Sequence, residues 1–305
     1  MLAPRERVAY SPIIERPAVR WPNGARVAVW VAPNVEHHDY TPPHNPARDP
    51  FPRVPHPDVQ QYSIRDYGNR VGFWRTAEVM DEFGVRCTLS LNLAVLEHFP
   101  QIRDAIVARR WAVMAHGFYN TRFMYGMSED EERAFYVDQI ETVRRETGMP
   151  VKGMLGPGVT GTERTPDLMA EAGFIYHADW VHDDQPVPIR VAKGKLFSIP
   201  YSWEINDGPL FARHYDGAYF AQIAKLQFDR LYEEGDRTGL VYCLAIHPFR
   251  IGQPHMIDHL RDIVRHIASR KDVWLATGDE IADHYLANYY DRDVALAVPR
   301  AKGVR

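Results

Sequence analysis

Short apolar runs alternate along this chain with segments of helical character. The first run, RVAVWVA at 26–32, lacks the polar alternation of a half-exposed strand, which is typical of a strand covered on both faces in a parallel sheet. Further strands are expected at RCTLSLN, WAVMAHG, 174–177, KLFSIP, GLVYCLAI and VWLA, with helices between them. Such alternation predicts parallel strands joined by helical crossovers. About seven units without a linker-like break favour one α/β domain of barrel type, spanning 1–305, over two domains.

Two of the expected helices begin with explicit capping signals. Ser128 is followed by Glu131, so the hydroxyl can cap the Glu131 amide while the Glu131 carboxylate reaches back. Thr165 stands directly before Pro166, which predicts a second N-cap with proline at the first helical position.

Two segments do not fit the alternation. The first is an N-terminal arm of about 1–20. The second is a loop of about 39–63, with seven prolines between 42 and 57, which block both a helix and a central strand. Loops of this length are often lids or binding loops. We expect this one to cover a pocket or to reach a neighbouring subunit, and a surface insertion is the alternative.

The charge pattern limits the possible partners. The formal net charge is -4, and no run of five like charges occurs, so neither nucleic acid nor an anionic membrane is expected as a partner. A small neutral or weakly charged ligand fits better. Cys87 and Cys243 lie in apolar segments and are expected to be buried rather than paired. Neither a signal-peptide core nor a membrane-length apolar segment is visible, which predicts a cytoplasmic protein.

Polar residues gather at the ends of four expected strands. These segments are NVEHH at 34–38, AHGFYN at 115–120, HADWVHDD at 177–184 and IHPFR at 246–250. In parallel α/β folds the ligand site lies beyond the carboxyl ends of the strands. A lone histidine there is usually structural, but four such segments predict a site. Histidine and carboxylate groups at one rim can bind a divalent metal or act as general acid and base.

In order, these motifs, together with LGPGVTGT at 155–162 and IPYSWEIND at 199–207, resemble the polysaccharide deacetylase superfamily. The resemblance runs from about Trp21 to Asn288 and is greatest to the branch of metal-independent allantoinases, cyclic imide hydrolases and an atypical peptidoglycan deacetylase. It implies a distorted (β/α) barrel of about seven units and hydrolysis of a C–N bond other than a peptide bond. It also implies a homo-oligomer, a dimer or a tetramer.

The chain departs from the superfamily at the metal-binding positions. Sugar deacetylases carry a paired-Asp motif on the first strand, where this chain has Asn34 and Glu36. Their second motif has two histidines four apart, whereas His116 is followed by Asn120. A zinc ion would at best have Glu36, His116 and Asn120 as ligands, and an amide oxygen is a poor zinc ligand. Weak zinc binding, recruitment of a metal through His37, and no metal all stay open.

The resemblance implies roles for three side chains. His247 matches the position of a histidine that protonates the leaving group. Glu36 is expected to activate water, directly or through a metal held with His116.

Other residues are candidates for binding the substrate or its intermediate. The backbone of 156–161 can present N–H groups to an anionic intermediate, or can serve only a tight turn. The aromatic candidates can wall a flat pocket or simply pack, and Asp183 and Asp184 can orient His116 or His247 or cap a turn. The substrate-binding candidates are Asn34, Phe118, Tyr119, Pro157, Asp183, Tyr201 and Trp203.

The leading functional prediction is a hydrolase that opens a small cyclic amide, imide or ureide by water attack. One alternative is a de-N-acetylase of an N-acetylated sugar or of peptidoglycan. A second alternative is a non-catalytic barrel that only binds its ligand.

Overall fold

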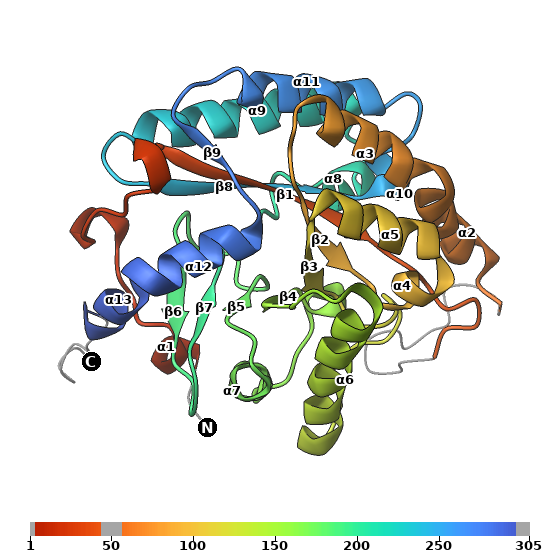
Figure 1. Cartoon of the computed structure of the whole chain (residues 1–305), viewed down its shortest axis with the longest axis horizontal. Coiled ribbons are helices and arrows are strands. Elements are labelled where there is room, and N and C mark those ends of the chain that lie inside the picture. The colour runs from red at the N-terminus through yellow and green to blue at the C-terminus, as the bar shows by residue number, and fades with distance from the viewer. Residues whose placement is uncertain (1–3, 44–56, 297–305) are drawn as a thin grey trace.

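The computed structural model describes residues 4–43 and 57–296. Within these ranges one sheet has the strand order β6-β7-β5-β4-β3-β2-β1-β8, and β9 also pairs with β1 (Figure 1). All pairings are parallel except that of β6 with β7. The strands are β1 Val27–Val35, β2 Thr88–Leu91, β3 Ala112–Ala115, β4 Gly153–Met154, β5 Tyr176–His177, β6 Val187–Ile189, β7 Leu196–Ser198, β8 Leu240–Ile246 and β9 Val273–Leu275.

Helices cover the outer side of this curved sheet, which confirms the predicted distorted (β/α) barrel. Figure 1 places α9 and α11 along β8 and β9, and α12 and α13 beside β6 and β7. The helices are α1 Pro4–Arg7, η1 Ile13–Glu15, η2 Pro22–Gly24, α2 Val59–Tyr67, η3 Gly68–Gly72, α3 Phe73–Glu82, α4 Ala94–His98, α5 Pro100–Arg109, α6 Glu129–Thr147, η4 Pro157–Val159, α7 Thr165–Ala172, α8 Asp207–Ala212, α9 Gly217–Glu234, α10 Pro248–Ile251, α11 Ile257–Ala268, α12 Gly278–Asn288 and α13 Tyr290–Leu296.

The first strand is buried on both faces, as its apolar run predicts. All nine residues of β1 are buried. Val27, Val29 and Val31 belong to one hydrophobic cluster, which includes helix residues, whereas Trp30 and its alanine neighbours belong to a second. Trp30 is fully buried and donates a hydrogen bond from Nε1 to the carbonyl of Pro200 at 3.1 Å. The strand therefore lies at the centre of the molecule and holds its end rigidly.

Two details of the sequence analysis need correction. α2 already begins at Val59, where Asp58 caps the helix by accepting a hydrogen bond from the Gln61 amide, so the predicted loop of 39–63 extends too far. Much of that loop, residues 44–56, lies outside the described residues. Thr165 is the first helical residue of α7 and not its N-cap, because its hydroxyl bonds to the fully buried side chain of Glu132. The capping box at Ser128 is confirmed.

The π-helical segment η3 packs closely against α10, the short helix that follows the end of β8. The continuous helical stretch α2-η3-α3 contains a π-helical turn at Gly68–Gly72, a feature often found at functional sites. A Cβ on Gly72 would lie 2.0 Å from the carbonyl oxygen of Pro248 in α10. Only glycine therefore lets η3 approach α10 this closely.

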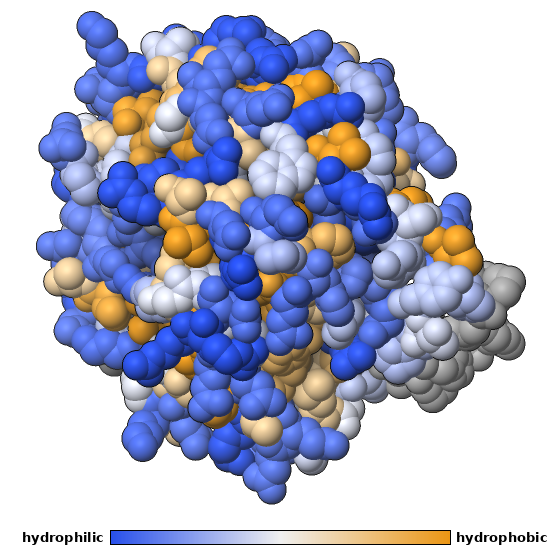
Figure 2. Space-filling model, turned by 45° about the vertical axis from the view of Figure 1, so that its right-hand side comes forward, coloured by the Kyte–Doolittle hydropathy of each residue, from blue (hydrophilic) through white to orange (hydrophobic). Residues whose placement is uncertain are grey.

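The described surface is mixed in character. Figure 2 shows small apolar groups separated by polar residues on the face in view. In the two described ranges, no helix combines the length and the apolar character that crossing a membrane requires. Cys87 and Cys243 are buried and unpaired, as predicted.

Candidate active site

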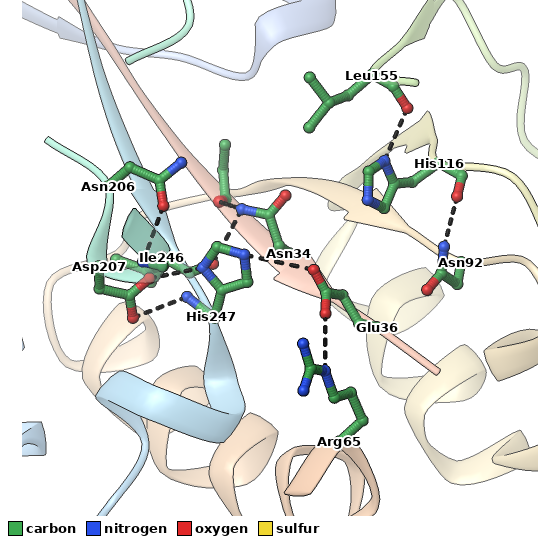
Figure 3. A network of polar contacts seen from close by, with 12 residues as sticks. Asn34, Glu36, Arg65, Asn92, His116, Leu155, Asn206, Asp207, Ile246 and His247 are labelled. Carbon is green, nitrogen blue, oxygen red and sulfur yellow. Dashed lines mark hydrogen bonds and ion pairs between the residues drawn. The ribbon is translucent and has the colours of Figure 1, made fainter. Parts of the chain in front are cut away.

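The polar residues predicted at three strand ends lie along the same edge of the sheet. β1 and β8 are parallel neighbours with Pro33 opposite Ile246, so the residues that follow them lie side by side. β2 separates β1 from β3, which ends just before His116. Along the edge the order is therefore His247, Glu36 and then His116. Figure 3 shows Glu36 between the two histidines.

His247 is held between two carboxylates. Its Nδ1 donates to Asp207 Oδ1 at 2.6 Å, and its backbone N donates to Asp207 Oδ2 at 3.0 Å. On the other side, its Nε2 lies 3.4 Å from Glu36 Oε1 (Figure 3). Asn206 forms a parallel bridge with Ala245, which brings the start of α8 to the end of β8. This bridge positions Asp207 beside the imidazole.

Glu36 is also bound by an arginine from α2. Arg65 donates from Nε to Glu36 Oε2 at 3.1 Å, and its guanidinium lies 4.4 Å from the ring centroid of Phe249. Asn69 in η3 donates to the backbone carbonyl of Glu36 at 3.0 Å. We call Glu36, Arg65, Asp207 and His247 the Glu36 cluster. The contact between η3 and α10 brings α2 onto this cluster.

Charge interactions within the Glu36 cluster favour an ion pair. Burial by itself would lower the pKa of His247, but the charges and hydrogen bonds of Asp207 and Glu36 raise it to about 9. Burial would raise the pKa of Glu36, but the hydrogen bond from His247 and the charges of His247 and Arg65 hold it well below its usual range. At neutral pH, His247 is therefore an imidazolium and Glu36 a carboxylate.

His116 is neutral and has a defined tautomer. Its Nδ1 donates to the carbonyl of Leu155 at 2.7 Å, which leaves Nε2 as an acceptor. Burial lowers the pKa of His116, although the charge of Glu36 opposes this shift. Asn92, directly after β2, forms hydrogen bonds to the ends of both neighbouring strands. Its side chain accepts from the His37 amide after β1 at 2.9 Å and donates to the His116 carbonyl after β3.

A pocket of about 490 Å³ opens at the carboxyl ends of β4 and β5. His177, Asp179 and Trp180 of the predicted polar segment line it. Asp179 connects this pocket with His116: its carboxylate accepts from the Gly156 amide at 2.7 Å, directly after Leu155, and its charge raises the pKa of His116. The pocket therefore lies on the His116 side of the site.

Several predicted substrate-binding residues make internal contacts, although Tyr201 also lines a cavity of about 270 Å³. Asn34 donates to the Ile246 carbonyl at 3.2 Å and to the Tyr201 hydroxyl at 2.9 Å, so its side chain joins β1 to β8 and to the segment after β7. Phe118 packs against Phe135 with 6.3 Å between ring centroids.

The remaining candidates lie apart from the Glu36 cluster. Tyr119 accepts or donates a hydrogen bond with His98 Nε2 at 3.0 Å. Asp183 pairs with Arg16 of the N-terminal arm at 2.5 Å, and Trp203 is 45% exposed. Pro157 is buried at the start of η4.

Two backbone N–H groups of the segment 156–161 already have hydrogen-bond acceptors within the protein. The Val159 amide donates to the Gly156 carbonyl at 2.8 Å, and the Gly156 amide donates to Asp179. Neither of these N–H groups is therefore free for an anionic intermediate.

The predicted zinc ligands do not form a metal site in the described arrangement. No group of three His, Cys, Asp or Glu side chains in the described part of the chain could hold a metal ion. Both carboxylate oxygens of Glu36 face cationic groups, which a metal cation would have to displace. The buried Asn120 Oδ1 has no hydrogen-bond partner, and the His37 ring packs against Phe99 and Tyr119. Whether Glu36, His116 and Asn120 bind zinc once Arg65 and His247 are displaced therefore stays a prediction.

The sequence analysis missed three residues of the site. Asp207 stood inside the quoted motif IPYSWEIND, and its position before a short helix was the available signal. Asn92 is the last residue of the predicted strand RCTLSLN, and its position at a strand end is the same signal that marked the histidines. Arg65 comes from a helix after the Pro-rich loop, and no local pattern marked it.

Comparisons with known proteins agree with these observations. No family model matches the chain. A "Putative polysaccharide deacetylase" of Schizosaccharomyces pombe is 25% identical over 260 residues, covering 79% of this chain and 80% of the relative. A peptidoglycan deacetylase of Helicobacter pylori is 23% identical over 253 residues, covering 72% of this chain and 85% of the relative.

Two solved structures are similar over nearly their whole length. A probable polysaccharide deacetylase from Pseudomonas aeruginosa has a TM-score of 0.81 at 26% identity, covering 90% of this chain and 96% of the other. Puue allantoinase has a TM-score of 0.80 at 25% identity, covering 95% and 99%. The resemblance to the polysaccharide deacetylase superfamily and its allantoinase branch is thus confirmed. The chain is a hydrolase of C–N bonds other than peptide bonds.

Proposed function

We propose that this chain opens a small cyclic amide, imide or ureide by attack of water on the carbonyl carbon. The observation that carries the proposal is the buried His247 imidazolium, held 2.6 Å from Asp207 and 3.4 Å from Glu36 at the carboxyl edge of the sheet. A cationic acid held in this way can protonate the nitrogen that leaves when an amide bond breaks. The similarity to Puue allantoinase, over 95% of this chain, supports a cyclic substrate.

Glu36 takes the proton from the attacking water. In the resting pair its low pKa makes it a weak base. As His247 gives its proton to the leaving nitrogen, the positive charge that lowers the pKa of Glu36 disappears, so Glu36 becomes a stronger base during the same step. The new C–O bond forms, the C–N bond breaks, and the ring opens to a carboxylic acid and a protonated nitrogen.

The other polar groups hold and stabilise the reacting atoms. His116 accepts a hydrogen bond at Nε2 from the water or from an N–H of the substrate, since its Nδ1 is committed to Leu155. Arg65 places positive charge beside Glu36, where the oxyanion of the tetrahedral intermediate develops. We propose that the pocket lined by His177, Asp179 and Trp180 takes the rest of the ring.

A de-N-acetylase is the second candidate, because two of the similar proteins are named as deacetylases of polysaccharide or peptidoglycan. The same water, base and acid would release acetate from an N-acetylated sugar. The two candidates differ in the acyl group, which is part of a ring in one and a free acetyl group in the other.

A hydrolysis panel distinguishes these candidates. Allantoin, hydantoin, succinimide, phthalimide and an N-acetylated sugar are tested in metal-free buffer and again with added zinc. Ring opening without acetate release supports the main proposal. Acetate release alone supports the second candidate, and binding without turnover would mean a non-catalytic barrel.

Two variants test the assigned roles. Glu36→Gln and His247→Gln should each lower kcat by about 100-fold or more, as is typical when a general acid or base is lost. Glu97→Gln and His255→Gln are matched controls, because both side chains are exposed and neither belongs to the Glu36 cluster. Full activity in Glu36→Gln or His247→Gln would remove that residue from the mechanism.

A further inference from the structure

Arg250, three residues after His247, carries a half-buried guanidinium that has no hydrogen-bond or ion-pair partner among residues 4–43 and 57–296. Its Nε is buried and has no hydrogen-bond acceptor. In the described part of the chain, no ion pair of this side chain is found either. A charge that is partly removed from water and left unpaired costs free energy, so an anionic ligand at this position would be stabilised.

The surroundings of Arg250 place it beside the candidate active site. Its guanidinium lies 5.3 Å from the ring centroid of Phe249, against which the guanidinium of Arg65 also lies. The Phe249 ring in turn meets the His247 ring edge-on at 5.3 Å. Burial lowers the pKa of Arg250, while the charges of Asp207 and Glu36 oppose this shift. The positive charge is therefore within electrostatic reach of both carboxylates.

Those two carboxylates are already engaged. Asp207 is bound to His247, and Glu36 is bound to His247 and Arg65. Three cationic side chains, those of Arg65, His247 and Arg250, thus face two anionic ones. The neighbouring His38 adds no charge at neutral pH, because burial and Arg65 lower its pKa to about 4. One positive charge, that of Arg250, is left over.

We infer that Arg250 binds a carboxylate of the substrate, so that the preferred substrates are cyclic amides or ureides bearing an acidic group. The planar fork of a guanidinium matches a carboxylate and can bind it through two parallel hydrogen bonds. The Arg250 guanidinium and the His247 ring both lie 5.3 Å from the centroid of the Phe249 ring. One small ring can therefore reach both groups. This inference rests on the proposed function and deepens it.

The test compares rings with and without an acidic substituent: dihydroorotate with dihydrouracil, which differ by a carboxylate, and hydantoin-5-acetate with hydantoin, which differ by a carboxymethyl group. The wild-type protein should prefer the acidic member in kcat/KM. In Arg250→Gln this preference should fall about 10- to 100-fold, the usual effect of losing a charge-assisted hydrogen bond. Arg250→Lys should keep part of it. Arg230→Gln, at an exposed arginine of α9 that pairs with Glu233 and Glu234, is the matched control and should keep all of it.

The outcomes separate this inference from the proposed function. A wild-type preference for the neutral rings would overturn the inference without any variant. An equal loss for both members in Arg250→Gln would also overturn it, because Arg250 would then act on the reacting carbonyl. If no ring is opened at all, the proposed function fails, and calorimetric titration with hydantoin-5-acetate decides the inference. Binding that is lost in Arg250→Gln supports it, and binding that is unchanged overturns it.

Discussion

At the scale of single residues, the candidate site depends on which charges are paired. His247 has a carboxylate on each ring nitrogen, at 2.6 Å and 3.4 Å, and both stabilise its protonated form. Glu36 lies between that imidazolium and the guanidinium of Arg65, and both positive charges lower its pKa. The pKa of Glu36 therefore depends on whether His247 is protonated. The pair therefore titrates as a unit, and its pH dependence reports on both residues.

We predict that kcat/KM is constant near neutral pH and falls tenfold per pH unit above about 9, because His247 must be protonated and its pKa is raised to about 9. Asp207→Asn should move this falling limb to lower pH by one unit or more. The control is Asp229→Asn, which removes a similar contact to His266, 2.8 Å long, far from the site. A wild-type limb near the ordinary histidine pKa would contradict the assignment.

The same pKa shift has a consequence for stability. Because the folded pKa of His247 is above its unfolded value of about 6.5, the stabilisation is fully present below that pH and is lost as pH rises through about 9. Thermal unfolding between pH 6 and 10 should show this loss in the wild-type protein. Asp207→Asn should show a smaller one.

At the scale of elements, the close packing of η3 on α10 determines how α2 meets the site. Arg65 and Asn69 reach Glu36 only because the helical stretch lies against Pro248 and Phe249. A similar close approach occurs at α8, where a Cβ on Gly208 would lie 2.7 Å from Cε1 of His247. Glycines thus allow two helices to support the histidine from different sides.

Gly72→Ala should lower the free energy of unfolding by about 1–3 kcal/mol, the usual cost of overpacking, because the added methyl group would meet the Pro248 carbonyl. It should also lower kcat/KM, since α2 would shift away from Glu36. Chemical denaturation and steady-state kinetics measure the two effects. Arg70→Ala, at an exposed position in the same π-helical turn, should leave the free energy of unfolding nearly unchanged. Equal behaviour of the two variants would argue against the packing role.

At the scale of the whole molecule, the N-terminal arm forms ion pairs with α7 and with the segment that follows β5. Arg7 is 5% exposed and bonds to both carboxylate oxygens of Asp167 in α7, at 2.8 Å and 3.2 Å, and to the carbonyl of Arg190 after β6. Arg16 pairs with Asp183 after β5, and the Val19 carbonyl accepts from the amide of Gly239, directly before β8, at 2.9 Å. The arm therefore connects strands from both ends of the strand order.

Asp167→Ala should lower the free energy of unfolding by about 3–5 kcal/mol, because it leaves the buried guanidinium of Arg7 without its partner. The double variant Arg7→Met with Asp167→Leu should lose less than this. Asp291→Ala, which breaks the exposed pair with Lys195, should cost at most about 1 kcal/mol. Urea denaturation of the four proteins gives the comparison. A cost for Asp167→Ala as small as that for Asp291→Ala would refute the prediction that the ion pair between Arg7 and Asp167 stabilises the fold.

Local patterns predicted elements better than their boundaries. The apolar run of β1, the capping box at Ser128 and the polar residues after β1, β3 and β8 were readable because each depends on residues close in sequence. The N-cap role of Thr165 was wrong because a distant buried carboxylate, Glu132, binds its hydroxyl. The limit of 63 for the Pro-rich loop was wrong because the Asp58 cap was overlooked.

The sequence by itself determined the α/β alternation, the buried central strand and the presence of Glu36, His116 and His247 at strand ends. Only the tertiary structure decided which of them touch. Glu36 and His247 meet because β1 and β8, far apart in the chain, are adjacent in the sheet. Asp207 raises the pKa of His247, and Arg65 lowers that of Glu36. The physical reason is that hydrophobic periodicity is a local property, whereas charge pairing depends on which segments the fold brings within a few ångströms.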